Sequence, residues 1–252
     1  MTNQRPLIWI TGASSGLGLQ LVLDYLDRGY RVIASSRNIE SNQRLLKEAH
    51  CFLLAVDISS KESLAHAQDV ILDQFGFLDK LIVNAGTCEY ATSLPYDLSM
   101  WERIYQTNLW GAIATINTAL PLLKKSRQKP QIVGIGSMAF FAPFSKAAFY
   151  GASKAGLDYF LKALQVDLYP HNIDVSIIHP GFIKTPLTDK NTFSMPFILS
   201  VEKASALVVD AIESRKKYFY FPKRLRYILR LSQLFPSLWI EKVAEKLPFR
   251  NN

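Results

Sequence analysis

The chain has 252 residues, 49% of them hydrophobic and 20% charged, and this composition excludes a disordered or low-complexity protein. The net charge of +8 leaves nucleic acid, an anionic membrane and an anionic cofactor as admissible partners. Two cysteines are too few for a disulfide framework, so we expect a reducing, cytoplasmic compartment, and their spacing predicts no metal site. The apolar stretch 109–123 is shorter than the roughly 20 residues of a spanning helix, so no transmembrane segment is expected.

Short apolar runs alternate along the chain with longer segments of helical periodicity. The predicted strands are Leu7–Ile10, Arg31–Ser35, Cys51–Val56, Lys80–Val83, Gln131–Ile135, Ile173–Ile178 and Tyr218–Phe221. The predicted helices lie near 16–28, 38–48, 60–75, 99–125, 146–169 and 202–214. This alternation predicts an α/β fold, a Rossmann-type doubly wound parallel sheet of about seven strands with helices on both faces. The unbroken apolar run 52–56 predicts a strand in the centre of that sheet.

A glycine-rich loop follows the first predicted strand and leads directly into a helical pattern. Glycine allows a sharp turn, and the free N–H groups of a helix N-terminus attract anionic oxygens. The loop therefore predicts a phosphate-binding site, although a tight turn without a ligand has the same composition. The residues with this predicted role are Gly12, Ser14, Ser15, Gly16, Leu17 and Gly18.

The spacing of this loop resembles the TGxxxGxG loop of the short-chain dehydrogenase/reductase family. Further motifs of that family follow in the same order, from residue 7 to about residue 186: Asp57, Asn84-Ala85-Gly86, Asn108, Ser137, Tyr150-x-x-x-Lys154 and Pro180-Gly181. The resemblance implies a nicotinamide-dependent oxidoreductase that forms a homodimer or a homotetramer. It also implies that Asp57 and Ile58 border the adenine, that Asn84, Ala85 and Gly86 line the cofactor edge, and that Pro180, Gly181, Ile183 and Thr185 contact the nicotinamide.

The end of the second predicted strand bears on cofactor choice. A carboxylate there would bind the 2′-hydroxyl of NAD and repel the 2′-phosphate of NADP, whereas this chain has Ser36 and Arg37. A guanidinium can pair with a phosphate, so NADP (NADPH) is the expected cofactor, in preference to NAD. The alternative is that Arg37 is a solvated surface charge and Ser36 a turn residue.

Tyr150 and Lys154 are four residues apart on a predicted helix and therefore point to one side of it. A nearby ammonium favours the phenolate of a tyrosine, which otherwise titrates at about 10. The family resemblance implies that Tyr150 is the general acid/base and that Ser137 binds the substrate oxygen. It further implies that Lys154 contacts the ribose and that Asn108 holds a water linking Lys154 to solvent. For Asn108, a buried amide that bonds the helix backbone is an equal alternative.

Aromatic residues cluster after Ser137 and in the segment after Thr185. If Met138, Phe140, Phe141, Phe144, Phe149, Phe193, Met195, Pro196 and Phe197 line the cleft, the substrate is hydrophobic. The alternative is that the same side chains pack helix against sheet or form a subunit interface. His179 has no partner pattern in the sequence and is interpreted as a structural residue.

We expect one domain over residues 1–252, with a substrate lid at 187–205 and a basic amphipathic helical extension at 222–252. That extension either docks on an anionic membrane at the cytoplasmic face or covers the last strand. No recognition motif for nucleic acid accompanies its charge, so no nucleic acid partner is expected.

The predicted function is an NADP(H)-dependent oxidoreductase that interconverts a carbonyl and an alcohol on a hydrophobic substrate. The alternatives are a catalytically idle NADP-binding sensor or scaffold, and a membrane-docked lipid-modifying reductase.

Overall fold

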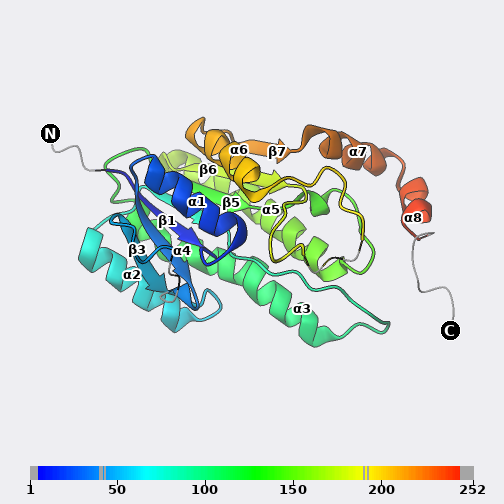
Figure 1. Cartoon of the computed structure of the whole chain (residues 1–252), viewed down its shortest axis with the longest axis horizontal. Helices are drawn as coiled ribbons and strands as arrows, with labels where there is room; N and C mark the ends of the chain where they lie inside the picture. The colour runs from blue at the N-terminus through cyan, green and yellow to red at the C-terminus, as the bar shows by residue number, and fades with distance from the viewer. Residues whose placement is uncertain (1–4, 40–41, 43, 190, 192, 245–252) are drawn as a thin grey trace.

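One parallel sheet of seven strands forms the centre of the molecule (Figure 1). The computed structural model describes residues 5–39, 42, 44–189, 191 and 193–244. The strand order is β3-β2-β1-β4-β5-β6-β7. The strands are β1 Leu7–Thr11, β2 Arg31–Ser36, β3 Cys51–Ala55, β4 Lys80–Val83, β5 Gln131–Ile135, β6 Asp174–Pro180 and β7 Tyr218–Phe221. The winding reverses between β1 and β4, which is where ligands bind in open sheets of this type.

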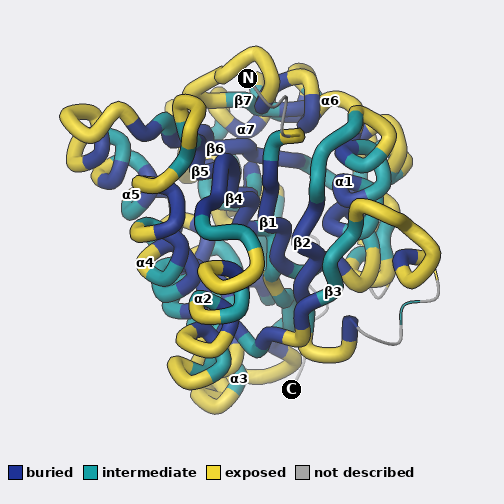
Figure 2. Tube along the Cα trace, turned by 90° about the vertical axis from the view of Figure 1, so that its left-hand side faces the viewer, coloured by how far each residue is buried: buried dark blue, intermediate teal, exposed yellow. Residues whose placement is uncertain are grey.

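Helices cover both faces of the sheet. They are α1 Gly16–Asp27, α2 Lys61–Phe75, α3 Leu98–Tyr105, α4 Ala112–Leu123, α5 Ala148–Leu168, α6 Val201–Glu213, α7 Lys223–Leu234 and α8 Pro236–Ala244. Side chains of α1 and α6 pack in one core and those of α2, α4 and α5 in the other, so the strands lie buried between two helical layers (Figure 2). The predicted fold class is confirmed.

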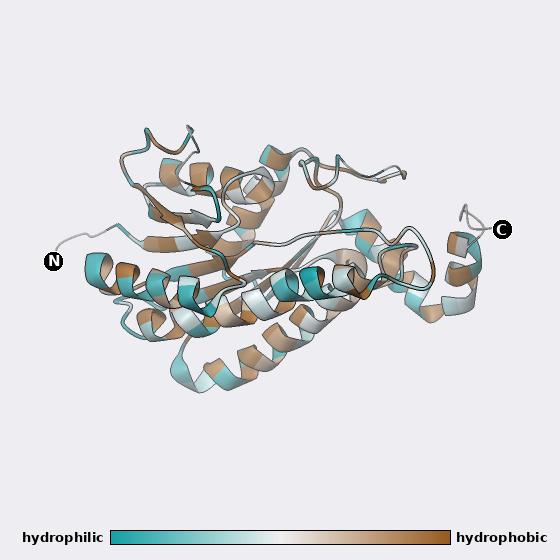
Figure 3. Cartoon of the chain, turned by 90° about the horizontal axis from the view of Figure 1, so that it is seen from below, coloured by the Kyte–Doolittle hydropathy of each residue, from teal (hydrophilic) through white to brown (hydrophobic). Residues whose placement is uncertain are grey.

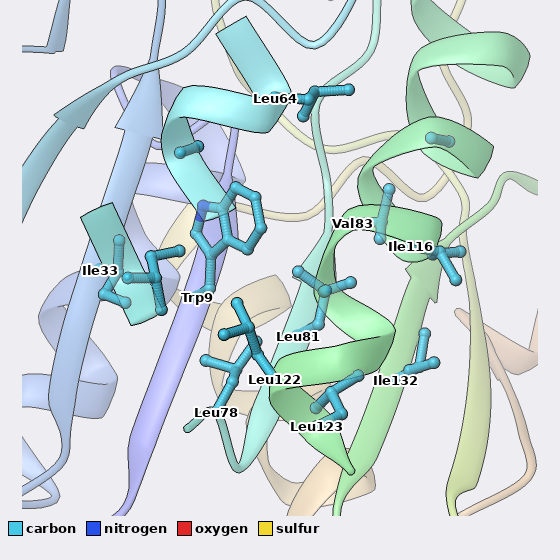
Figure 4. Close-up of a cluster of buried hydrophobic side chains, with 14 of the residues drawn as sticks. Trp9, Ile33, Leu64, Leu78, Leu81, Val83, Ile116, Leu122, Leu123 and Ile132 are labelled. Atoms are coloured by element: carbon cyan, nitrogen blue, oxygen red, sulfur yellow. The ribbon is translucent and has the colours of Figure 1, made fainter. Parts of the chain in front are cut away.

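The strand β1 shows why the sheet is buried on both sides. Its side chains alternate, so that Leu7 and Trp9 enter the core with α2, α4 and α5 while Ile8 and Ile10 enter the core with α1 and α6. The Trp9 ring lies in the middle of the first of these cores (Figure 4), and its indole N–H donates to Ser35 Oγ at 2.8 Å. The helices that line these two cores bury one side, and hydrophilic and hydrophobic residues alternate along them accordingly (Figure 3).

Local signals set the ends of individual helices. At the start of α2, the Ser60 side chain accepts a hydrogen bond from the Ser63 N–H, which supplies a partner for one of the free donors of the first turn. At the other end, Gly76 adopts a left-handed conformation with φ of 78°. A polar cap and a terminal glycine thus bound this helix.

Three expectations about individual elements were wrong. The apolar strand β3 lies at the edge of the sheet, and most of its residues are only partly buried. In the predicted helix at 38–48, the described residues form turns, and residues 40, 41 and 43 lie outside the described part. The predicted helix at 99–125 is divided into α3 and α4 by a π-helical turn, Gln106–Gly111. Such turns are rare and frequently lie beside functional sites.

No helix among the described residues is both long enough and apolar enough to span a bilayer. The segment predicted as a lid, 187–205, includes the first turn of α6, which begins at Val201. The predicted extension, 222–252, contains α7 and α8, and residues 245–252 lie outside the described part of the chain.

Candidate active site

The glycine loop after β1 requires its glycines for both conformation and space. Gly12 and Gly16 have φ of 65° and 54°, a region that side-chain-bearing residues rarely adopt. A Cβ atom on Gly12 would lie 2.7 Å from Ala85 Cα, and one on Gly18 would lie 2.2 Å from the Gly12 carbonyl oxygen. The loop is therefore packed tightly between the N-terminus of α1 and the end of β4.

Hydrogen bonds join this loop to the end of β4. The Asn84 Nδ2 donates to the main-chain carbonyls of Thr11 at 3.0 Å and Gly12 at 3.2 Å. In return, the Thr11 hydroxyl accepts from the main-chain N–H groups of Asn84 at 3.1 Å and Ala85 at 3.2 Å. The carboxyl ends of the two strands at which the winding reverses are thus held together.

A cleft of about 790 Å³ runs along the carboxyl ends of the strands. It contains all the residues predicted to bind the cofactor, contributed by the glycine loop and by the segments that follow β2, β3, β4, β5 and β6. They are Gly12, Ser14, Ser15, Gly16, Leu17, Gly18, Ser36, Arg37, Asp57, Ile58, Asn84, Ala85, Gly86, Tyr150, Lys154, Pro180, Gly181, Ile183 and Thr185. Ser137 lines the same cleft.

One end of the cleft fits an anionic group. The Ser36 hydroxyl is buried there without a hydrogen-bond partner, and the exposed Arg37 is its neighbour in the chain. Asp57 is the nearby acid, but its Oδ1 accepts from the Ser59 N–H at 2.9 Å. Hydrogen bonds from Ser59 and the charge of Arg37 lower the Asp57 pKa and keep its carboxylate ionised. The free hydroxyl and the guanidinium are the donors that a phosphate group would use.

The hydroxyl of Ser137, the phenol of Tyr150 and the ammonium of Lys154 lie together at the other end. Ser137 accepts from the Ala139 N–H at 3.1 Å and is hydrogen-bonded to Tyr150. Lys154 Nζ lies 6.0 Å from the centre of the Tyr150 ring and donates to the Ile135 carbonyl at 3.1 Å. Tyr150 and Lys154 on α5 therefore lie next to Ser137 at the end of β5, as their sequence positions predict.

Burial shifts the titration of both α5 groups. It raises the Tyr150 pKa to about 12, with the Ser137 hydrogen bond acting in the opposite direction. It lowers the Lys154 pKa to about 8, because the charged amine loses solvation. At neutral pH the site thus holds a protonated phenol next to an ammonium that is close to titrating.

Comparison with known proteins identifies the family. The family described as short chain dehydrogenase matches residues 6–194. The chain belongs to the short-chain dehydrogenase/reductase family. An uncharacterized oxidoreductase from Myxococcus xanthus is 34% identical over 248 residues, covering 94% of this chain and 96% of that protein. The 11-beta-hydroxysteroid dehydrogenase-like 2 protein of Arabidopsis thaliana is 30% identical over 246 residues, covering 92% of this chain and 78% of that protein.

Solved structures of the family share the fold. A short chain dehydrogenase from Burkholderia cenocepacia in complex with NADP superimposes with a TM-score of 0.83 at 24% identity, covering 96% of this chain and 99% of that one. A short chain dehydrogenase/reductase from Burkholderia phymatum in complex with NAD has a TM-score of 0.83 at 18% identity, covering 100% of this chain and 99% of that one. These structures show that the chain has the fold of the family.

Asn108 lies behind the cleft of this short-chain dehydrogenase/reductase. It is fully buried in the π-helical turn, where its Oδ1 accepts from the Thr87 N–H at 2.7 Å. Its Nδ2 donates to the Thr87 carbonyl at 2.9 Å and to Ser153 Oγ at 3.0 Å. Ser153 in turn donates to the Tyr150 carbonyl at 2.8 Å. The Asn108 amide therefore connects the segment after Gly86 to the first turns of α5.

Two further residues lie near the end of the cleft that contains Ser137, Tyr150 and Lys154, which we call the reactive end. Their position there could not be predicted from the sequence. Cys88 and Tyr90 follow the Asn84-Ala85-Gly86 motif and interact with each other through a side-chain hydrogen bond. Burial raises the pKa of both groups. Cys88 lies close enough to Lys154 and Tyr150 to affect their titration. Their approach to α5 depends on the course of a loop, which periodicity does not predict.

His179 has a partner that its sequence position does not reveal. Its Nε2 lies 2.8 Å from Asp158 Oδ1, and Asp158 also pairs with Lys162 at 2.6 Å. The imidazole is fully buried and stacks on Tyr220 at 4.5 Å. Because Asp158 is one turn beyond Lys154 on α5, this pair ties α5 to the end of β6.

The apolar residues of the segments after Ser137 and after Thr185 differ in their surroundings. Met138 and Phe141 are buried in a core with Leu225 and Leu229 of α7, so they pack between elements. Phe193, in contrast, makes edge contacts with Tyr90 at 5.6 Å and Phe182 at 6.1 Å. These three rings form an aromatic group beside the reactive end, because Tyr90 also interacts with Tyr150.

The packing of the glycine loop leads to a prediction about stability. We expect Gly18→Ala to lower the free energy of unfolding by about 3 kcal/mol, because the added methyl group meets backbone atoms that cannot move aside. The matched variant Gly151→Ala, whose nearest contact is Ala139 O at an ordinary 3.7 Å, should raise it by about 0.5–1 kcal/mol. Urea unfolding followed by circular dichroism measures both values, and equal stabilities of the two variants would contradict the packing argument.

Proposed function

We propose that the protein is an NADP(H)-dependent oxidoreductase that interconverts a carbonyl and an alcohol on a hydrophobic substrate, with Tyr150 as general acid/base. One observation carries the proposal. The cleft that is lined by the glycine loop is also lined by the Ser137 hydroxyl, the Tyr150 phenol and the buried Lys154 ammonium, which lie close together in its wall. An idle sensor would not need these three groups, so their joint presence supports an enzyme.

In the direction of reduction, the Ser137 and Tyr150 hydroxyls donate hydrogen bonds to the carbonyl oxygen of the substrate and hold its carbon in place. Bound NADPH supplies the hydride that adds to this carbon. Tyr150 gives its proton to the oxygen, which completes the alcohol. The Lys154 ammonium stabilises the phenolate that Tyr150 becomes, and the Asn108 and Ser153 hydrogen bonds position α5 for this step.

The proposed preference for NADP rests on the end of β2. The unpartnered Ser36 hydroxyl and the Arg37 guanidinium would hold the 2′-phosphate, and the described residues of this strand end include no acid to repel it. The relatives do not decide the matter, since one solved structure of the family is in complex with NADP and another with NAD.

The proposed hydrophobic substrate rests on the aromatic group of Tyr90, Phe182 and Phe193. Rings at this place suit a lipophilic ketone or aldehyde next to the Tyr150 hydroxyl. A series of carbonyl compounds of increasing apolar surface, tested for NADPH consumption, should show kcat/KM rising with that surface. A preference for the most polar compounds of the series would contradict this part of the proposal.

We also propose that the protein assembles as a homodimer or homotetramer in the cytoplasm. The outer side of α5 carries exposed Tyr159 and Val166, with side chains 77% and 72% accessible, which a second copy would cover. The two cysteines are free, in keeping with a reducing compartment. Analytical ultracentrifugation that finds only monomer at micromolar concentration would contradict the assembly.

The role of Tyr150 is tested by Tyr150→Phe. This variant should lose at least about 1000-fold in kcat, because the proton donor is gone, while it binds NADPH as the unaltered protein does. NADPH fluorescence measures binding, and Tyr159→Phe on the exposed side of the same helix is the matched control. Retained turnover in Tyr150→Phe would refute the mechanism.

The role of Arg37 is tested by Arg37→Asp. We expect the KM for NADPH to rise about 10- to 100-fold and the KM for NADH to stay the same or fall, since the carboxylate repels the phosphate and can bind a ribose hydroxyl. The exposed Arg44→Asp is the control with the same change in charge. If both variants alter selectivity equally, Arg37 does not contact the 2′-phosphate.

The Lys154 pKa of about 8 predicts the pH dependence of reduction. A lysine is charged below its pKa, so kcat/KM should be constant below pH 8 and should fall above it as the ammonium loses its proton. Tyr150 stays protonated through this range, because its pKa is raised to about 12. A pH profile that rises through pH 8, at constant thermal stability, would show that the ammonium does not assist the proton transfer.

A further inference from the structure

The helix α7 presents two different apolar sides. Leu225 and Leu229 point inward and pack with Met138 and Phe141. On the opposite side, Tyr227, Leu231 and Leu234 are 66%, 57% and 71% exposed. Their spacing of four and three residues places these three side chains on one side of the helix. This outer side therefore plays no part in the packing of the described molecule.

Apolar residues are also exposed on α8, where Leu238 and Ile240 lie on different sides of the helix. We name the exposed apolar residues of α7 and of the position that follows it the C-terminal apolar face; they are Tyr227, Ile228, Leu231, Leu234 and Phe235. Trp239 points the other way, donates from its indole N–H to the Pro143 carbonyl at 2.8 Å and meets Phe144 edge-on. The two helices are therefore fixed to the body of the protein while their outer sides stay uncovered.

Basic side chains are frequent on the same two helices, where Lys223 and Arg224 are exposed while Arg226 and Arg230 lie over the rings of Tyr220 and Phe141. The helices contain Lys223, Arg224, Arg226, Arg230 and Lys242 but only one acid, Glu241. Arg226 stacks on Tyr220 at 4.4 Å, and none of the five cations forms an ion pair within the described residues. The combination of exposed apolar residues and unpaired positive charge is complementary to anionic headgroups above an apolar layer.

A second cavity lies on the side of α8 that faces the body of the protein. It has a volume of about 510 Å³ and is lined by apolar residues, among them Leu94, Tyr96 and Phe144. Phe144 contacts Trp239, so the cavity wall and α8 are in direct contact. Leu94 and Leu98 are also largely exposed. Figure 1 shows α7 and α8 beyond the end of β7, and the loop that leads into α3 extends toward the same end of the molecule.

We propose that the C-terminal apolar face docks on the surface of an anionic lipid bilayer, with α7 and α8 lying in the plane of the headgroups. A second copy of the chain is a poorer occupant, because a symmetric contact would bring the five cations of one copy against those of the other. Docking at this end orients the molecule so that the apolar cavity next to Trp239 is near the lipid.

Vesicle co-sedimentation of the full chain tests the proposal without cofactor or substrate, so its outcome is independent of the proposed enzymatic function. We expect binding to vesicles of phosphatidylcholine mixed with phosphatidylglycerol, and weak binding to phosphatidylcholine alone. Lys223→Gln with Arg224→Gln should weaken binding about 30-fold, because each surface cation contributes about fivefold near an anionic bilayer. The control with the same loss of charge is Lys124→Gln with Lys125→Gln, on the exposed segment after α4, and it should bind as the unaltered chain does.

The apolar contribution is tested by Leu231→Ser with Leu234→Ser, which should weaken binding at least about tenfold, while exposed Leu46→Ser has no effect. Circular dichroism verifies the fold of each variant, and all the altered side chains are exposed. Absent binding to anionic vesicles, or equal losses in the face variants and in the controls, would overturn the proposal. So would a change from dimer to monomer in the face variants without lipid, which would assign the face to a second copy.

Discussion

The hydrogen bonds between the ends of β1 and β4 hold the remainder of the cleft in place. Asn84 and Thr11 exchange donors and acceptors across the point where the winding reverses, so the glycine loop cannot move independently of the segment that leads to Gly86. Gly86 in turn lies beside Asn108 and Lys154, because a Cβ placed on it would be 3.3 Å from Asn108 Oδ1 and 3.5 Å from Lys154 Nζ. One connected network therefore extends from the loop to the ammonium.

The electrostatic character of the reactive end follows from burial rather than from neighbouring charges. Desolvation is the largest cause of the shift for both Tyr150 and Lys154, and it makes each group favour its neutral form. At neutral pH the site therefore holds a neutral phenol beside an amine whose pKa is lowered to about 8. At the opposite end of the cleft the charged groups keep more of their solvation, since Arg37 and Asp57 remain near solvent.

Much of this architecture could be predicted from the sequence because the strands and the motifs are local patterns. Four-residue spacing on a helix and a glycine loop after a strand both specify geometry over short distances, and the structure places Tyr150, Lys154 and Gly12 accordingly. The position of β3 could not be predicted, because an apolar run reads the same at the edge of a sheet as in its centre. The Asp158–His179 pair and the approach of Cys88 arise from tertiary packing between distant segments, which no periodicity records.

Asn108 shows a second limit of local patterns. The helical periodicity around it is continuous, yet the backbone changes to a π-helical turn, and the side chain bonds to Thr87 and Ser153 instead of entering the cleft. A pattern of residue types indicates that a helix passes here. It does not indicate how many residues each turn contains.

The contacts of α7 and α8 with the segment after Ser137 have a consequence for biosynthesis. Met138, Phe141 and Pro143 have partners among Leu225, Leu229 and Trp239, which the ribosome adds nearly a hundred residues later. The wall that carries the Ser137 hydroxyl therefore acquires its final packing only after α7 and α8 have been synthesised.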